Sequence, residues 1–125
     1  MSLAIEEIMT EFSKRQLQIG EEIRRATARE IVELIDTRID GDFLTIMKAE
    51  ISKDLRYCKI FYRCKVANRE AFQHALDGIV GELTNILYKK LALRLRPEIR
   101  FVFDDTMKII EEIERVVEKN KEFGE

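Results

Sequence analysis

The chain has 125 residues, a length that suits one domain with a single hydrophobic core. Hydrophobic residues make up 46% of it and charged residues 37%, as in folded, soluble proteins with a heavily charged surface. No apolar run approaches the ~20 residues of a membrane-spanning helix. Acids at Glu6, Glu7 and Glu11 argue against a secretory or mitochondrial leader, so we expect a cytoplasmic protein without membrane contact.

The charges are unevenly distributed along the chain, although the net charge is only −2. Residues 1–13 hold three acids and no base, and residues 104–125 hold eight acids and four bases. Residues 14–103 therefore hold 18 bases against 13 acids. A basic centre between acidic ends can bind nucleic acid, but ordinary surface charge can segregate in the same way.

The first third of the chain predicts helices. An apolar pattern over residues 5–12 predicts a short amphipathic turn, which Lys14-Arg15-Gln16 interrupts. A longer stripe, with Ile23, Ile31 and Ile35, predicts a helix from Gly20 to Arg38. Asp40-Gly41-Asp42 then predicts a turn.

Two alternating runs follow, Phe43–Ser52 and Tyr57–Val66, joined by a short polar link. This pattern predicts an antiparallel hairpin. Cys58 and Cys64 share the apolar parity of Ile60 and Tyr62, so we expect both thiols to be buried and reduced.

An apolar stripe at helical spacing runs from Phe72 to Leu91, and Gly78 and Gly81 lie within it. Each glycine costs roughly 1 kcal/mol in a helix interior, so we expect two helices joined by a kink at residues 78–81. Pro97 ends the second helix, and residues 99–103 predict a strand.

The last part of the chain predicts a turn and a helix. Asp104-Asp105 predicts a strand-end turn or helix cap rather than a metal site, and Met107–Lys119 predicts an amphipathic helix. The order of elements predicts an α+β two-layer domain, with a three-stranded sheet and helices on one face.

Four stretches together resemble the ribosome-binding factor A family of bacteria, which has a type II KH-like fold. They are Ile23-Arg24-Arg25, the hairpin from Phe43 to Ile60, Gly81 with the segment up to Pro97, and Pro97 to Thr106. The chain departs from the family at Ile79, where a small residue is usual two positions before the kink glycine. It departs again at Ala92, a position where the family often has a basic residue.

The resemblance implies a KH type II-like order of α-β-β-α-kink-α-β, with an additional C-terminal helix. It divides the chain into an extension at 1–18, an RNA-binding domain at 19–106, and a helix with a frayed tail at 107–125. It implies a monomeric, non-enzymatic factor that binds the small ribosomal subunit and its 16S rRNA late in assembly and supports growth in the cold. No cofactor or metal is implied.

The residues themselves offer no catalytic constellation. His74 is the only histidine and has no matched cysteine, serine or carboxylate cluster around it in the sequence. We therefore expect no enzyme activity.

Basic residues form two candidate RNA-binding surfaces. One is the outer face of the hairpin and its link, with Lys53, Arg56, Lys59 and Arg63. Tyr57 and Phe61 alternate with these bases and either stack on RNA bases or pack under the last helix. The other surface is helical, with Arg24, Arg25, Lys89, Lys90, Arg94 and Arg96. We expect Lys89, Lys90, Arg94 and Arg96 to matter most, because the only acid near them in the sequence is Glu98.

Two other functions remain open from the sequence. One is a generic KH-type binder of single-stranded nucleic acid, in which Gly78 and Gly81 contact the phosphate backbone. The other is a protein-interaction module that docks an apolar terminal helix on a partner.

Overall fold

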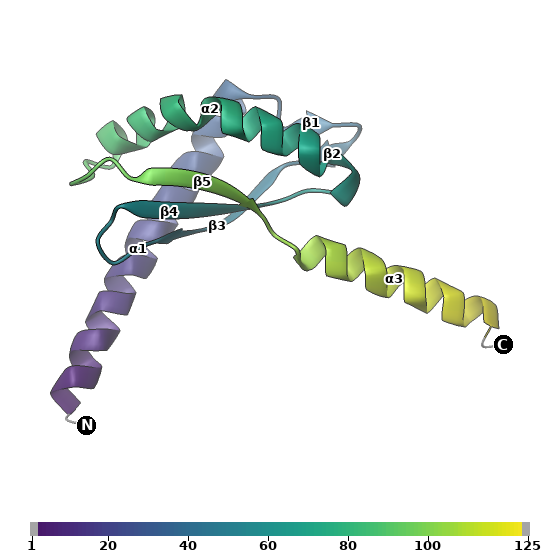
Figure 1. Cartoon of the computed structure of the whole chain (residues 1–125), viewed down its shortest axis with the longest axis horizontal. Coiled ribbons are helices and arrows are strands. Elements are labelled where there is room, and N and C mark those ends of the chain that lie inside the picture. The colour runs from purple at the N-terminus through teal and green to yellow at the C-terminus, as the bar shows by residue number, and fades with distance from the viewer. Residues whose placement is uncertain (1–2, 124–125) are drawn as a thin grey trace.

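The computed structural model describes the backbone of residues 3–123 and the side chains of residues 14–106 and 109–119. A long helix and a small hairpin come first, then a three-stranded sheet with a crossover helix, then a final helix (Figure 1). The elements are α1 (Leu3–Leu34), β1 (Arg38–Ile39), β2 (Asp42–Phe43), β3 (Thr45–Ile51), β4 (Tyr57–Arg63), the 3₁₀ turn η1 (Val66–Asn68), α2 (Arg69–Lys90), β5 (Glu98–Phe103) and α3 (Thr106–Phe123).

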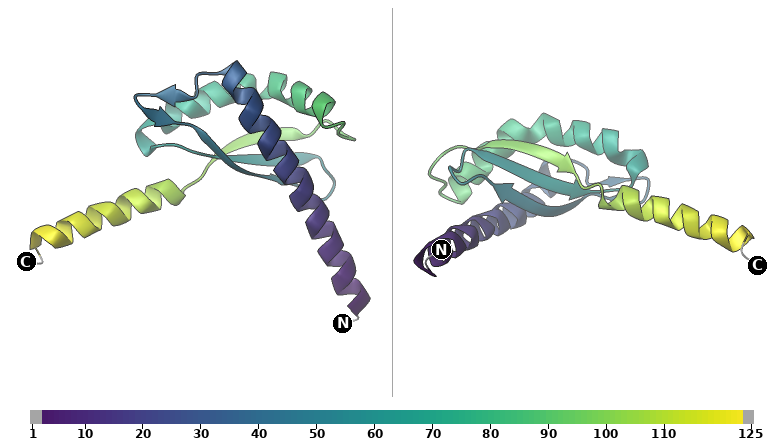
Figure 2. Two further views of the ribbon diagram at one scale, coloured as in Figure 1. Left: turned by 180° about the vertical axis from the view of Figure 1, so that it is seen from behind. Right: turned by 60° about the horizontal axis from the view of Figure 1, so that its bottom comes forward.

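The main sheet has the strand order β3-β4-β5. β3 and β4 form the predicted antiparallel hairpin, and β5 lies parallel to β4 after the crossover through α2. Helices α1 and α2 lie on the same side of this sheet (Figures 1 and 2). The predicted α+β two-layer architecture is therefore confirmed, and no helix within residues 3–123 lies on the other face of the sheet.

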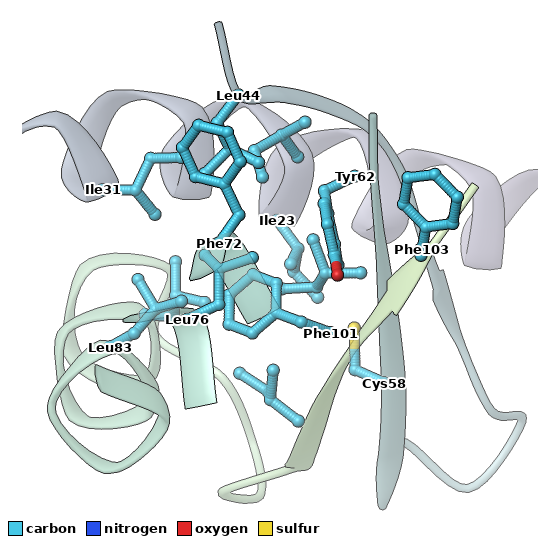
Figure 3. Close-up of a cluster of buried hydrophobic side chains, with 14 of the residues drawn as sticks. Ile23, Ile31, Leu44, Cys58, Tyr62, Phe72, Leu76, Leu83, Phe101 and Phe103 are labelled. Atoms are coloured by element: carbon cyan, nitrogen blue, oxygen red, sulfur yellow. The ribbon is translucent and has the colours of Figure 1, made fainter. Parts of the chain in front are cut away.

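The core lies between the sheet and these two helices (Figure 3). The inward residues of β4 are buried, as their parity predicts, and so are alternate residues of β5. These strand residues pack against apolar side chains of α1 and α2. The buried core includes Cys58, Ile60, Tyr62, Phe101, Phe103, Ile23, Ile31, Phe72, Leu76 and Leu83. Alternation along β4 thus decides which side chains point to the opposite face of the sheet. We call this face, which α1 and α2 do not cover, the open face.

A hydrogen-bond network joins α2 to the sheet. The buried Tyr62 hydroxyl donates to Oε1 of Gln73, and burial raises the pKa of Tyr62 to about 12. Nε2 of Gln73 in turn donates to the Phe101 carbonyl oxygen at 3.1 Å and to Asp77 at 3.0 Å. Gln73 therefore joins α2 to both β4 and β5.

Helix α2 is continuous, so the prediction of two helices joined at Gly78 and Gly81 is wrong. Both glycines lie on the exposed face of one helix from Arg69 to Lys90. Apolar side chains such as Phe72, Leu83 and Leu87 are buried before and after them. Because that burial stabilises the whole helix, it outweighs the low helix propensity of two glycines.

Helix α1 is also continuous and passes through the predicted interruption at residues 14–16. It ends at Leu34 rather than at Arg38. The side chain of Gln16 donates to the Ile51 carbonyl oxygen at 3.2 Å, so the polar stretch is used to attach α1 to the end of β3. The apolar side chains predicted at residues 5–12 lie outside the described side chains.

The predicted turn at Asp40-Gly41 closes the small β1–β2 hairpin. Asp40 has φ of 48° and Gly41 has φ of 76°, as in a two-residue type I′ turn. The buried carboxylate of Asp42 accepts hydrogen bonds from the Lys65 backbone N–H at 2.8 Å and from the Asn68 side chain at 2.9 Å. These bonds fix the hairpin beside the start of α2.

Helix α3 extends away from the sheet (Figures 1 and 2). It includes the predicted Met107–Lys119 and continues to Phe123. Its apolar stripe is exposed, with Ile109, Ile113 and Val116 each more than half accessible to solvent. The helix therefore does not cover the outer face of the hairpin. Within residues 3–123, no helix combines the length and apolarity needed to cross a membrane.

The close packing of α1 on β3 at Gly20 gives a stability prediction. A methyl group added at Gly20 of α1 would collide with the Ala49 backbone carbonyl oxygen of β3. We expect Gly20→Ala to lower the free energy of unfolding by about 1–3 kcal/mol. Urea unfolding followed by circular dichroism measures the change.

The matched control is the pair Gly78→Ala and Gly81→Ala, because added methyl groups there meet open space. Each should raise the free energy of unfolding by roughly 0.5–1 kcal/mol. A Gly20→Ala protein as stable as the wild type would contradict the close packing of α1 on β3.

The buried thiols give a second prediction. Burial raises the pKa of Cys58 to about 12 and that of Cys64 to about 11, so little thiolate forms at neutral pH. We expect both thiols to react with a thiol reagent at pH 8 only on unfolding. Thr45→Cys, at an exposed position of β3, should react at once and serves as the control. Rapid labelling of both native cysteines in the folded protein would contradict the burial of this face.

Candidate nucleic-acid interface

The structure brings parts of the two predicted basic surfaces together at one end of the main sheet. The β3–β4 loop and the α2–β5 loop both lie at the left of Figure 1. Leu55 of the first loop and residues 91–95 of the second line one small apolar pocket with Ile19 of α1. The Glu98 backbone N–H also donates to the Arg56 carbonyl oxygen at 2.7 Å. We call Lys53, Arg56, Arg94 and Arg96 the basic end.

All four side chains of the basic end are exposed. The Arg56 guanidinium lies 3.9 Å from the Asp54 carboxylate, which is a weak, solvent-exposed pair. The Arg96 guanidinium lies 5.5 Å from the centre of the Tyr88 ring, a contact that holds the side chain without cancelling its charge. The basic end therefore presents a net positive surface.

The β3–β4 loop is shaped by its own side chains. The Asp54 carboxylate accepts hydrogen bonds from the Ser52 hydroxyl at 2.7 Å and from the Arg56 backbone N–H at 3.1 Å. These bonds, the Ser52 bond first, lower the pKa of Asp54. Leu55 adopts a left-handed conformation with φ of 63°. The loop thus presents Lys53 and Arg56 from a defined turn.

The α2–β5 loop begins with a Schellman-type helix end. The Leu93 backbone N–H donates to the Tyr88 carbonyl oxygen at 3.2 Å, and the Ala92 N–H donates to that of Lys89 at 3.4 Å. Ala92, which departs from the usual basic residue of the resembled family, occupies the left-handed position with φ of 49°. Pro97 is buried at the far end of the loop. Both ends of the segment carrying Arg94 and Arg96 are therefore fixed.

The remaining helical bases are partly neutralised. Glu21 accepts hydrogen bonds from Arg24 at 2.5 Å and from Arg25 at 3.2 Å, and the Arg24 bond is the main cause that lowers the pKa of Glu21 to about 2. Lys90 pairs with Glu30 of α1. Lys89 is exposed at the end of α2.

The two predicted RNA-binding residues on β4, Lys59 and Arg63, lie in different surroundings. Lys59 is exposed on the open face of the sheet, near the basic end. Arg63 lies at the other end of β4, where its guanidinium pairs with Asp104 at 3.4 Å. Arg63 is therefore separated from Lys53 and Arg56 by the length of a strand.

Two bases of the open face were missed by the sequence analysis. Arg100 of β5 lies in register with Lys59, and its parity opposite to Ile99 and Phe101 could have indicated this. Lys48 of β3 lies in register with Phe61 because the pairing shifts between Ile46 and Lys48. This irregularity changes which parity faces outward, so simple alternation could not place Lys48.

The described side chains form no candidate metal site. His74 is exposed on α2, and no group of three or more histidine, cysteine or acidic side chains in residues 14–106 and 109–119 is placed to hold a metal ion. Asp104 forms the predicted strand-end turn, since its Oδ1 accepts from the backbone N–H of Thr106 at 3.0 Å.

Comparisons with known proteins agree on one family. The family model described as ribosome-binding factor A matches residues 15–117. A ribosome-binding factor A of Paracidovorax citrulli is 33% identical over 92 residues, which are 74% of this chain and 72% of that protein.

One solved structure and one homology model fitted into a cryo-EM map share the fold. The Thermotoga maritima protein described as a putative ribosome binding factor A is 29% identical, with a TM-score of 0.62 over 70% of this chain and 85% of its own. A Thermus thermophilus ribosome binding factor A, fitted into the cryo-EM map of a 30S complex, is 22% identical. Its TM-score is 0.57 over 71% of this chain and 94% of its own.

The Asp104 turn gives a prediction of pH dependence. Hydrogen bonds from Thr106, and then Arg63, hold the pKa of Asp104 below its usual range. Its carboxylate therefore adds stability above the ordinary pKa of about 4 and loses it as the pH falls through the lowered value. We expect Asp104→Ala to lower the free energy of unfolding by about 1 kcal/mol at pH 7, and by less at pH 3.

The control is Glu82→Ala in the interior of α2, because that exposed side chain makes no hydrogen bond or ion pair within the described residues. Its effect should stay within about 0.5 kcal/mol at both pH values. Thermal unfolding at pH 7 and pH 3 compares the two variants. A pH-independent loss in Asp104→Ala would show that the charge contributes nothing.

Proposed function

Because the chain belongs to the ribosome-binding factor A family, we propose that it binds the small ribosomal subunit and its 16S rRNA as a late assembly factor. The family match over residues 15–117 carries the proposal, since it includes the whole sheet, α2 and most of α1. The Thermus thermophilus relative fitted into a 30S complex supports the same partner. In this proposal the chain acts as a cytoplasmic monomer, without catalysis or a cofactor, and supports ribosome assembly in the cold.

The proposed contact with rRNA is the basic end. Its four side chains come from two loops at the same end of the main sheet, whereas Arg24, Arg25 and Lys90 are held by glutamates. Arginine side chains whose backbone is fixed lose less entropy on binding phosphate than those on a mobile segment. The fixed ends of the α2–β5 loop therefore favour Arg94 and Arg96 as phosphate contacts.

A second candidate function is protein binding through α3. Its exposed stripe of Ile109, Ile113 and Val116 is the observation that favours it. Contact through an apolar stripe depends weakly on salt, whereas contact through phosphates weakens steeply as salt rises.

The salt dependence of binding tests the basic end. We expect a variant with Lys53, Arg94 and Arg96 changed to glutamine to lose up to three phosphate contacts. The slope of log affinity against log salt should then fall by about 2 to 3. Filter binding to a small-subunit rRNA fragment across a salt series measures it.

The matched control changes Arg24, Arg25 and Lys90 to glutamine, which removes the same number of charges from positions already paired with acids. Its slope should change little. Equal slopes in the wild type and both variants would favour the α3 alternative. Sedimentation of cell extract tests the function itself, because the proposal requires the protein in small-subunit fractions, mainly in immature particles.

A further inference from the structure

The open face of the main sheet carries an ordered row of side chains on its central strand. Tyr57, Lys59 and Phe61 are successive outward residues of β4, each about 7 Å from the next. Tyr57 is 57% exposed and Phe61 is partly exposed, and neither α1 nor α2 lies on this side. Helix α3 leaves from the end of β5 and extends away (Figure 2). Two aromatic rings therefore face solvent with a cation between them.

A second cation lies beside the first. Arg100 of β5 is the parallel-strand partner of Lys59, and both side chains are exposed on the same face. Like charges opposite each other destabilise a sheet unless an anion lies between them. Glu50 is the partner of Lys59 on the other side, but its carboxylate pairs with Lys48 at 3.1 Å. Among the described residues, Lys59 and Arg100 have no ion-pair partner within 4 Å.

The two cations border a shallow hollow of about 300 Å³ on the sheet surface. Tyr57, Cys58 and Glu98 complete its lining. Outside this hollow, further along β4, the Lys48 ammonium lies 4.7 Å above the centre of the Phe61 ring. A cation at this distance covers the ring weakly and can be displaced by a flat ligand.

The alternation of ring, cation pair and ring identifies the kind of ligand. An amphipathic helix needs a continuous apolar stripe, and here the charged pair separates the two rings. An inorganic anion would use only the cations. A single nucleic-acid strand has planar bases joined by phosphates, and such strands bind to proteins by stacking on aromatic side chains within positive grooves.

We propose that this open face binds two unpaired nucleotides of RNA, with bases stacked on Tyr57 and Phe61 and the phosphate between Lys59 and Arg100. A base on Phe61 takes the place of the Lys48 ammonium. The proposal deepens the proposed function and rests on it for the choice of RNA, because it makes the open face a site for a single-stranded segment next to the basic end.

The test measures binding of a fluorescently labelled hexamer of uridine or adenosine and of an RNA duplex by anisotropy. Tyr57→Leu and Phe61→Leu remove one ring each and keep every charge. Each should weaken hexamer binding roughly 5- to 100-fold, leave the salt slope unchanged and leave duplex binding unchanged. Changing both Lys59 and Arg100 to glutamine should lower the hexamer salt slope by about 0.7, because one phosphate contact is lost.

Phe43→Leu is the matched control, since Phe43 is also 57% exposed and has the Arg38 guanidinium over its ring, but lies on the β1–β2 hairpin. It should bind the hexamer like the wild type. Circular dichroism verifies the fold of each variant, and Tyr57→Leu is decisive if Phe61→Leu is unstable. Wild-type hexamer affinity in Tyr57→Leu, or an equal loss of duplex binding, would overturn the proposal.

Pelleting with purified small subunits separates this site from the proposed function. If the wild-type protein pellets with small subunits but Tyr57→Leu and Phe61→Leu leave hexamer affinity unchanged, the site is wrong and the proposed function is not affected. If the wild-type protein does not pellet with small subunits but each ring variant loses hexamer affinity, the site is supported and the proposed function is refuted. Ring variants that lose pelleting while keeping hexamer affinity would place a protein on this face and overturn the proposal.

Discussion

The structure depends on the burial of one face of the central strand β4. Cys58, Ile60 and Tyr62 point into the core beneath α1 and α2, and this burial is the main favourable contribution to folding. Because side chains alternate along a strand, the same constraint turns Tyr57, Lys59 and Phe61 to the opposite face. A shift of one residue in the pairing would bury the lysine and expose the core, so the register is strongly specified.

Two specific contacts then set where the helices lie on this sheet. The absence of a side chain at Gly20 lets α1 approach the backbone of β3 at Ala49. Gln73 joins α2 to β5 and to the buried Tyr62 hydroxyl. With both helices fixed, the β3–β4 and α2–β5 loops lie at the same end of the sheet. The positive charge of the basic end is thus a result of helix placement.

Much of the fold could be predicted from the sequence, because strands and amphipathic helices produce a short-range periodicity of apolar residues. The hairpin, the strand at residues 99–103 and the buried parity of Cys58 and Cys64 were all predicted correctly. The break at Gly78 and Gly81 was wrong, since local propensity costs less than the burial of apolar side chains on both sides of it. The β1–β2 strands, beyond their turn, were too short to show any alternation.

The sequence by itself determined the two-layer class, the inward and outward residues of β4, the aromatic and basic residues available for binding, and the resemblance to the family that the comparisons show. Only the tertiary structure decided how these residues are grouped. It joined Lys53 and Arg56 to Arg94 and Arg96, paired Arg24, Arg25 and Lys90 with glutamates, and set Arg100 beside Lys59. Such groupings depend on strand pairing and helix docking between distant segments, and no local pattern encodes the distance between two side chains that meet only when the chain folds.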